Sequence, residues 1–209
     1  MNQSNTALLV IDIINSCAHE KCEIPEWGIS FFKIRAMIPK LKDFIADYRK
    51  SFGGLVIFAN TTPWQKEYLT DNINELYTDP KACYYSKDDS GFAEEFYLVS
   101  PEAQDVVITK NHYDVFTNKK LQGLAKEKRI RYFIITGIFG DGCVMASICG
   151  GFSQGFNFVI LEDLIETTDV KIRQRLLQSL KEFTWPFMYG KTMDSKKFLS
   201  QYPKQRQIF

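Results

Sequence analysis

Short apolar runs alternate with longer amphipathic segments along this chain. Runs dominated by apolar residues, which are typical of parallel strands buried on both faces, occur at residues 7–11, 55–59, 106–108, 132–136 and 156–161. A sixth strand is predicted at 185–189. From Ile34 to Tyr48, apolar residues recur at helical spacing and form one face of a predicted helix. Further helices are predicted around 121–124, at 143–154 and at 170–183.

This alternation of strand and helix predicts an α/β fold, with a parallel sheet covered by helices on both faces. The segment 61–104 interrupts this alternation of strands and helices and is rich in Asp, Asn, Tyr and Lys. A long insertion between two strands is usually a functional flap or an arm for self-association. The chain has no internal repeat, low-complexity segment or linker, so we expect a single domain over residues 1–209.

Composition narrows the class of protein. The formal net charge is +1, so we expect neither nucleic acid nor a membrane surface as a partner. Apolar runs such as 132–135 are far too short to span a bilayer, and the polar N-terminus predicts no signal peptide. Five cysteines without a regular framework argue against a disulfide-stapled secreted domain. We therefore expect a cytoplasmic protein.

Polar residues follow the predicted strands at their carboxyl ends, where open parallel sheets bind ligands. One of them is Cys143, which starts a predicted helix after the glycine-rich segment 137–142. The first turn of a helix offers free N–H groups and a partial positive charge, both of which favour a thiolate. The alternative is a small cysteine that only packs against the sheet. The position of Cys143 on this turn favours a nucleophile.

Asp12 directly follows the first strand, and Lys110 ends the third. Each has an ordinary alternative role, Asp12 as a helix cap or loop anchor and Lys110 as a surface lysine. A carboxylate at the end of a buried strand is costly unless a cation or hydrogen bonds hold it. Because an Asp and a Lys at the same end of neighbouring strands can pair, Lys110 is expected to keep Asp12 charged and able to act as a base toward Cys143.

Four segments of the chain resemble motifs of the isochorismatase-like hydrolase superfamily. They are residues 7–12 for the opening motif, 107–110 with Tyr113 and Phe116 for the lysine motif, 137–144 for the glycine-to-cysteine loop, and 155–163 for the segment after that loop. The order and spacing of these motifs make the resemblance cover most of the chain, while 61–104 and the C-terminal tail match loosely.

The resemblance implies a three-layer α/β/α sandwich around a mainly parallel, six-stranded, Rossmann-like sheet. It implies a catalytic triad of Asp12, Lys110 and Cys143, and an oxyanion hole formed by the backbone N–H groups of Phe139 and Cys143. It also suggests a non-proline cis peptide bond between Ile138 and Phe139. The implied reaction is hydrolysis of an amide, carbamoyl or ureido C–N bond of a small molecule through a thioester, without a cofactor.

Several positions depart from the family pattern. Isochorismate-cleaving members lack the nucleophilic cysteine, so Cys143 places the chain on the amidase-like branch. Nicotinamidases carry an Asp-x-His metal motif where residues 60–64 here contain no histidine, and we expect no metal. Cys17, His19 and Cys22 are metal-ligand types, but their spacing fits no common zinc pattern. The substrate pocket is expected to include Cys17, Trp64, Ile138 and Phe139, with Phe92 and Phe116 as further candidates.

Two alternative functions, from classes other than hydrolases, stay open. A catalytically silent relative could bind a metabolite or a protein partner through the same fold, although the intact triad argues against it. A redox-sensing thiol at Cys143 would need a resolving cysteine, and Cys149 lies about two helical turns away. The long insertion and the aromatic tail indicate self-association, as a homodimer or tetramer, which the family also favours.

Overall fold

The computed structural model of the protein describes residues 1–76 and 90–202. Its six strands are β1 (Thr6–Ile11), β2 (Leu55–Thr61), β3 (Val106–Lys110), β4 (Tyr132–Gly137), β5 (Asn157–Ile165) and β6 (Gly190–Met193). They form one sheet in the order β3-β2-β1-β4-β5-β6, and each pair of neighbours is parallel. The predicted α/β class with a six-stranded parallel sheet is therefore confirmed.

The described residues also form seven α-helices: α1 (Asn15–Ala18), α2 (Phe32–Ser51), α3 (Asp71–Leu76), α4 (Lys119–Glu127), α5 (Met145–Ser153), α6 (Lys171–Ser179) and α7 (Ser195–Gln201). Short 3-10 turns lie at Gln3–Asn5, Glu20–Cys22, Pro25–Trp27, Phe92–Glu94 and Val115–Thr117, and wide helical turns at Gly140–Val144 and Leu180–Tyr189. Within the described ranges, no helix combines the length and apolar character needed to cross a bilayer.

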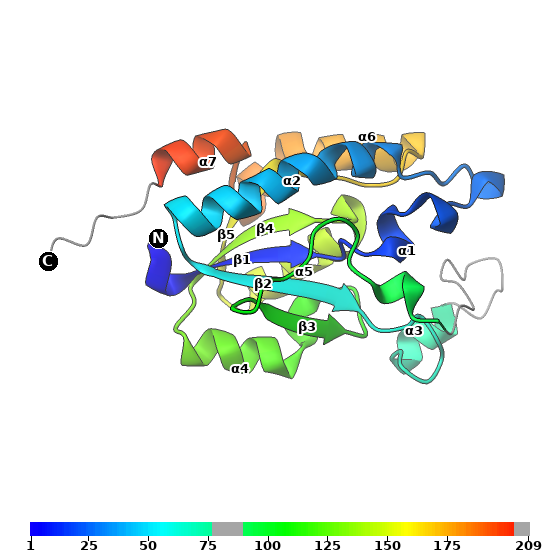
Figure 1. The fold of residues 1–209 in the computed structure, drawn as a ribbon, viewed down its shortest axis with the longest axis horizontal. Coiled ribbons are helices and arrows are strands. Elements are labelled where there is room, and N and C mark those ends of the chain that lie inside the picture. The colour runs from blue at the N-terminus through cyan, green and yellow to red at the C-terminus, as the bar shows by residue number, and fades with distance from the viewer. Residues whose placement is uncertain (77–89, 203–209) are drawn as a thin grey trace, which may run out of the picture.

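The strands divide their side chains between two cores. In β1, Leu8 and Val10 belong to a core shared with α2 and α7, whereas Ala7, Leu9 and Ile11 belong to a core shared with α4 and α5. Alternate residues of a strand point to opposite faces of its sheet, so an uninterrupted apolar strand serves both cores. Figure 1 shows α2 and α7 on one side of the sheet and α4 on the other, which gives the three expected layers.

The predicted strand at 185–189 is wrong. These residues lie in the wide helical turns that continue α6, and β6 begins only at Gly190. Trp185 is fully buried, and its indole N–H donates to Met145 Sδ at 3.2 Å, whereas Phe187 is 74% exposed. Residues two apart in a strand share a face, so one buried and one exposed aromatic residue at this spacing fit a helix instead.

The strand order creates a crevice beside β1. After β1 the chain builds β2 and β3 on one side, and it then crosses to place β4 on the other side. The segments that follow β1 and β4 therefore leave the sheet in opposite directions, and ligands of open α/β sheets bind in such a crevice. Asp12 follows β1, and the segment that leads to Cys143 follows β4.

Gly137 allows the ends of β1 and β4 to lie unusually close together. Its φ is +116°, and a Cβ added there would lie 2.2 Å from the carbonyl oxygen of Ile11. The next residue, Ile138, donates its N–H to that same oxygen at 3.0 Å. Only glycine fits this conformation and this approach, so Gly137 sets where the segment after β4 starts relative to Asp12.

We expect Gly137→Ala to lower the free energy of unfolding by about 3 kcal/mol or more, because it combines backbone strain with a clash against backbone atoms. Gly123→Ala is the matched control, since a Cβ at Gly123 in α4 meets nothing within 4 Å. In a helix that exchange should raise stability by up to about 1 kcal/mol. Chemical denaturation measures both, and equal stabilities of the two variants would contradict this account of Gly137.

Candidate functional site

Asp12 sits at the end of β1 in a left-handed backbone conformation with φ +53°. Its N–H donates to the carbonyl of Ala59 in β2 at 2.7 Å, and its own carbonyl accepts from Ile14 at 2.9 Å. Asp is one of the few residues that tolerate this conformation. The backbone thus turns sharply after β1 and holds the carboxylate inside the protein, where Asp12 is 3% exposed.

Lys110 reaches Asp12 from the edge of the sheet. Lys110 pairs in register with Thr61 of β2, so β2 separates β3 from β1, and the expectation that Asp12 and Lys110 end neighbouring strands is wrong. The long side chain spans this gap, and its Nζ lies 2.8 Å from Asp12 Oδ2. The two side chains are 1% and 3% exposed, so the expected pair exists as a buried ion pair.

Cys143 lies on the wide turn Gly140–Val144 that precedes α5. The Phe139 carbonyl organises this turn by accepting from the N–H groups of Gly142 at 2.9 Å and Val144 at 3.1 Å. The peptide bond between Ile138 and Phe139 is cis, as the resemblance suggested. Lys110 Nζ donates to Cys143 Sγ at 3.3 Å. One lysine therefore contacts both other members of the predicted triad.

Burial has the largest effect on the pKa of the Cys143 thiol. It raises the pKa of this thiol to about 12, while Lys110 lowers the pKa and Asp12 raises it. Burial thus opposes the thiolate that the start of the helix was expected to favour. Burial alone would lower the pKa of Lys110, but Asp12 and Cys143 outweigh it and raise that pKa. At neutral pH the site thus holds a neutral thiol beside a lysine ammonium.

The two oxygens of the Asp12 carboxylate differ in their partners. Oδ2 binds Lys110, whereas Oδ1 is buried and accepts no hydrogen bond from the residues that the structure describes. A buried carboxylate oxygen without a donor is costly, and such groups call for a functional explanation.

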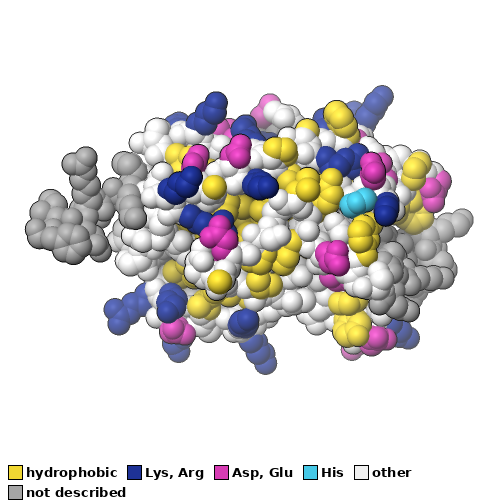
Figure 2. Space-filling view, in the orientation of Figure 1, with side chains coloured by type: hydrophobic (Ala, Val, Ile, Leu, Met, Phe, Trp, Pro, Cys, Tyr) yellow, Lys and Arg dark blue, Asp and Glu magenta, His cyan; other side chains and the backbone are white. Residues whose placement is uncertain are grey.

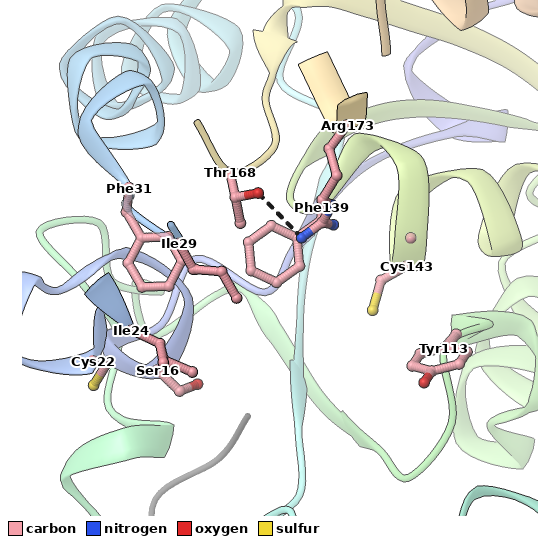
Figure 3. A pocket seen from close by; sticks show the side chains of 11 residues that line it. Ser16, Cys22, Ile24, Ile29, Phe31, Tyr113, Phe139, Cys143, Thr168 and Arg173 are labelled. Carbon is pink, nitrogen blue, oxygen red and sulfur yellow. Dashed lines mark hydrogen bonds between the residues drawn. The ribbon is translucent and has the colours of Figure 1, made fainter. Parts of the chain in front are cut away.

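A cavity of about 260 Å³ opens beside Cys143. Its lining consists of Ser16, Cys22, Ile24, Ile29, Phe31, Tyr113, Phe139, Gly142, Cys143, Thr168 and Arg173. Figure 3 shows Cys143 and Tyr113 on one side of this space and Phe31, Ile24 and Ser16 on the other. This size suits a small molecule whose reactive group lies against the Cys143 sulfur.

The structure brings only part of the predicted pocket to this cavity. Phe139 and Cys143 line it, whereas Cys17, Trp64 and Ile138 do not. Cys17 and Ile138 are buried in the core on the α2 side. Trp64 lies behind the lining, since its ring stacks on Tyr113 with centroids 5.9 Å apart.

The two further aromatic candidates also lie elsewhere. Phe116 is fully buried and packs against Phe133 with ring centroids 4.9 Å apart. Phe92 packs against His19 at 5.1 Å, on the segment that follows β1. Neither lines the cavity beside Cys143. Cys83 lies outside the described residues.

Part of the predicted flap packs against the segment that follows β1. Asn15 donates its backbone N–H to Glu95 at 2.9 Å and its side-chain amide to Phe92 at 2.9 Å, and Tyr97 donates its N–H to Ile13 at 3.0 Å. These bonds hold the wall of the cavity that carries Ser16. The role of 61–104 as a flap stays a prediction.

Sequence reasoning missed Arg173, Thr168 and the apolar wall made by Ile24, Ile29 and Phe31. The wall comes from an irregular segment between α1 and α2 without a recognisable motif. Arg173 lies in the first turn of α6, where an arginine usually reads as a solvated residue. The one available signal was the opposite charge of Asp141 in the segment before Cys143. Among the described residues, no group of three or more His, Cys, Asp or Glu could hold a metal ion.

Comparison with known proteins gives consistent matches. Residues 6–190 match the isochorismatase domain. The ureidoacrylate amidohydrolase RutB of Yersinia enterocolitica is 26% identical over 174 residues, which cover 77% of this chain and 74% of the relative.

Solved structures share the fold. An isochorismatase family protein from Burkholderia thailandensis superimposes with a TM-score of 0.74 at 16% identity, covering 94% of this chain and 95% of that one. The N-carbamoylsarcosine amidase of Thermoplasma acidophilum does so with a TM-score of 0.64 at 18% identity, covering 93% and 97%.

We expect Lys110→Met to lower the free energy of unfolding by about 3–5 kcal/mol, because it leaves the buried Asp12 carboxylate without its cation. Lys40→Met is the matched control. Lys40 pairs with Asp163 at 2.9 Å but is half exposed, and loss of such a pair costs about 0–1 kcal/mol. Urea denaturation measures the free energy of unfolding of both variants. If Lys110→Met loses less of it than Lys40→Met, the buried pair is not stabilising.

The raised pKa of Cys143 predicts how its alkylation depends on pH. The labelling rate follows the fraction of thiolate. Because the pKa is about 12, this rate should rise roughly tenfold per pH unit even above pH 8.5. An ordinary thiol, with a pKa of about 8.5, reaches a constant rate in that range. Iodoacetamide labelling followed by peptide mapping gives this rate. The same cysteine in denaturant is the control, and a plateau near neutral pH in the folded protein would refute the prediction.

Proposed function

The chain belongs to the isochorismatase family, and from that premise we propose that it is a cysteine-dependent hydrolase of a small molecule. The bond cleaved is the C–N bond of an amide, carbamoyl or ureido group. The observation that carries the proposal is the contact of one buried lysine with both Asp12, at 2.8 Å, and Cys143, at 3.3 Å, beside a cavity. The names of two relatives, an amidohydrolase and an amidase, support the type of reaction.

The first half of the reaction forms a thioester. Asp12 Oδ1 takes the proton from the neutral Cys143 thiol as the sulfur attacks the carbonyl carbon of the substrate. Base and nucleophile act together, because burial keeps the free thiolate scarce. The backbone N–H groups of Phe139 and Cys143 are proposed to hold the oxyanion that develops. Asp12 then returns the proton to the leaving nitrogen, and the C–N bond breaks.

The second half releases the acid. Asp12 takes a proton from a water molecule, which attacks the thioester carbonyl, and the sulfur leaves as Cys143 regains the proton. Lys110 stays charged throughout, since its pKa is raised, and its ammonium stabilises whichever of Asp12 and Cys143 carries the negative charge. This chain, the substrate and one water molecule supply all groups that the proposed reaction needs, so it requires no cofactor.

The remaining properties follow the same proposal. A small-molecule substrate is supported by the size of the cavity. On the face in Figure 2, positive and negative side chains intermingle, which does not favour a nucleic acid as the ligand. A cytoplasmic location is supported by free thiols at Cys17, Cys143 and Cys149. Self-association as a dimer or tetramer is supported by Phe183 and Phe187, which stack at 4.9 Å while 62% and 74% exposed.

We expect Cys143→Ala to lower kcat at least about 1,000-fold, because the covalent route is lost. The measurement is ammonia release from a panel of primary amides and N-carbamoyl compounds. Cys149→Ala is the matched control: it removes a thiol from the helix that follows Cys143, and that thiol does not line the cavity. Circular dichroism and urea denaturation verify that each variant is folded.

The outcomes separate the proposal from its alternative. Turnover that persists in Cys143→Ala would remove this residue from the role of nucleophile. Absence of turnover by the wild type across the panel, together with saturable binding of the same compounds, would favour a catalytically silent relative that binds a metabolite.

A further inference from the structure

The cavity beside Cys143 carries one charge in its lining, and that charge is already neutralised. Of the lining side chains in residues 1–76 and 90–202, only Arg173 is ionic. Its Nε lies 2.7 Å from Asp141 Oδ2, and its Nη2 lies 2.7 Å from Asp141 Oδ1. This is a two-point arginine–carboxylate pair, the strongest common arrangement of these groups.

The guanidinium makes two further contacts. Nη1 donates to Thr168 Oγ1 at 3.3 Å, as the dashed line in Figure 3 shows. The guanidinium carbon lies 4.7 Å from the centroid of the Phe139 ring, so this ring covers one flat face. Asp141 is itself fixed, because Thr167 Oγ1 donates to it at 2.5 Å and its side chain is 6% exposed. Arg173 therefore contacts the Phe139 ring, and Asp141 balances its charge, so an anion that enters the cavity meets no net positive charge at this residue.

The opposite side of the cavity is mainly apolar, with Ser16 and Cys22 beside three large apolar side chains. These are Ile24, Ile29 and Phe31, and the Phe31 ring lies 6.1 Å from that of Phe139. A carboxylate brought into such a space loses its hydration and gains no free cation in return, which is strongly unfavourable. Transfer of an uncharged apolar group from water to the same space is favourable, because the group then contacts apolar side chains instead of water.

We propose that the substrate is uncharged: an amide or carbamoyl compound whose substituent is neutral and apolar, with carboxylate-bearing analogues rejected. This inference rests on the proposed function, since it places the reactive carbonyl against Cys143. Asp141 is the residue that determines the rejection, because its negative charge cancels that of Arg173. Without the Asp141 charge, the cavity would gain a net positive charge and admit an anionic substituent.

Two alkylating amides of equal length test the substrate class independently of hydrolysis. N-butyl iodoacetamide ends in a methyl group and 4-(iodoacetamido)butanoic acid in a carboxylate. Each rate at Cys143 is measured by peptide mapping and divided by the rate of the same reagent with the protein in denaturant. We expect the neutral reagent to be favoured at least about tenfold, equivalent to about 1.4 kcal/mol. Equal rates, or a faster anionic reagent, would overturn the proposal.

Asp141→Asn tests whether the charge of Asp141 causes the preference for the neutral reagent. It removes one negative charge at Arg173, and we expect the preference for the neutral reagent to shrink at least about fivefold. Glu166→Gln is the matched control, since it removes the same charge nearby. Glu166 Oε1 accepts from Thr167 and Gln174 rather than from Arg173. A preference that survives Asp141→Asn, or that falls equally in both variants, contradicts the role given to Asp141.

Binding to Cys143→Ala separates this inference from the proposed function. Hexanamide should raise the thermal midpoint of that variant, whereas the monoamide of adipic acid, which adds a terminal carboxylate, should not. This result needs no reactive thiol and no turnover, so it decides the substrate class even if Cys143 is not the nucleophile or Asp141→Asn does not fold. Stronger stabilisation by the acid would overturn the inference, whatever the panel of amides shows.

Discussion

The buried ion pair between Lys110 and Asp12 constrains most of what surrounds it. Two charges can leave water together only when their geometry is good and further partners satisfy them. Here the lysine side chain crosses β2 to reach the end of β1, so the pair ties three strands together at their carboxyl ends. The second contact of Lys110, with the Cys143 sulfur, means that one cation contacts both the thiol and the Asp12 carboxylate.

This arrangement favours one kind of chemistry over another. A cysteine can be activated in advance as a thiolate, or it can stay neutral until a base removes its proton during attack. Burial opposes the first route at Cys143, and the unpaired oxygen of Asp12 suits the second. A neutral thiol is also less easily oxidised than a thiolate, so a site of this kind is protected while it waits for substrate.

The sequence predicted those parts of the site that obey a general rule. Asp12, Lys110 and Cys143 lie where polar residues follow buried strands, and the sheet brings such positions together. Arg173 and the apolar wall escaped notice, because irregular segments and a helix start bring them in without periodicity. The strand predicted at 185–189 failed because a short apolar run fits a buried helix equally well. The pKa of Cys143 depends on burial, and the residues next to it in the sequence do not determine burial.

The left-handed backbone at Asp12 has a consequence for which acids this position can accept. A φ of +53° is tolerated by Asn and Asp, whose short side chains hydrogen-bond locally, and is unfavourable for longer acids. Glutamate would meet this backbone penalty and would also carry its carboxylate one methylene further from Lys110. The backbone of the turn after β1 therefore favours aspartate over glutamate at this position, whatever the substrate.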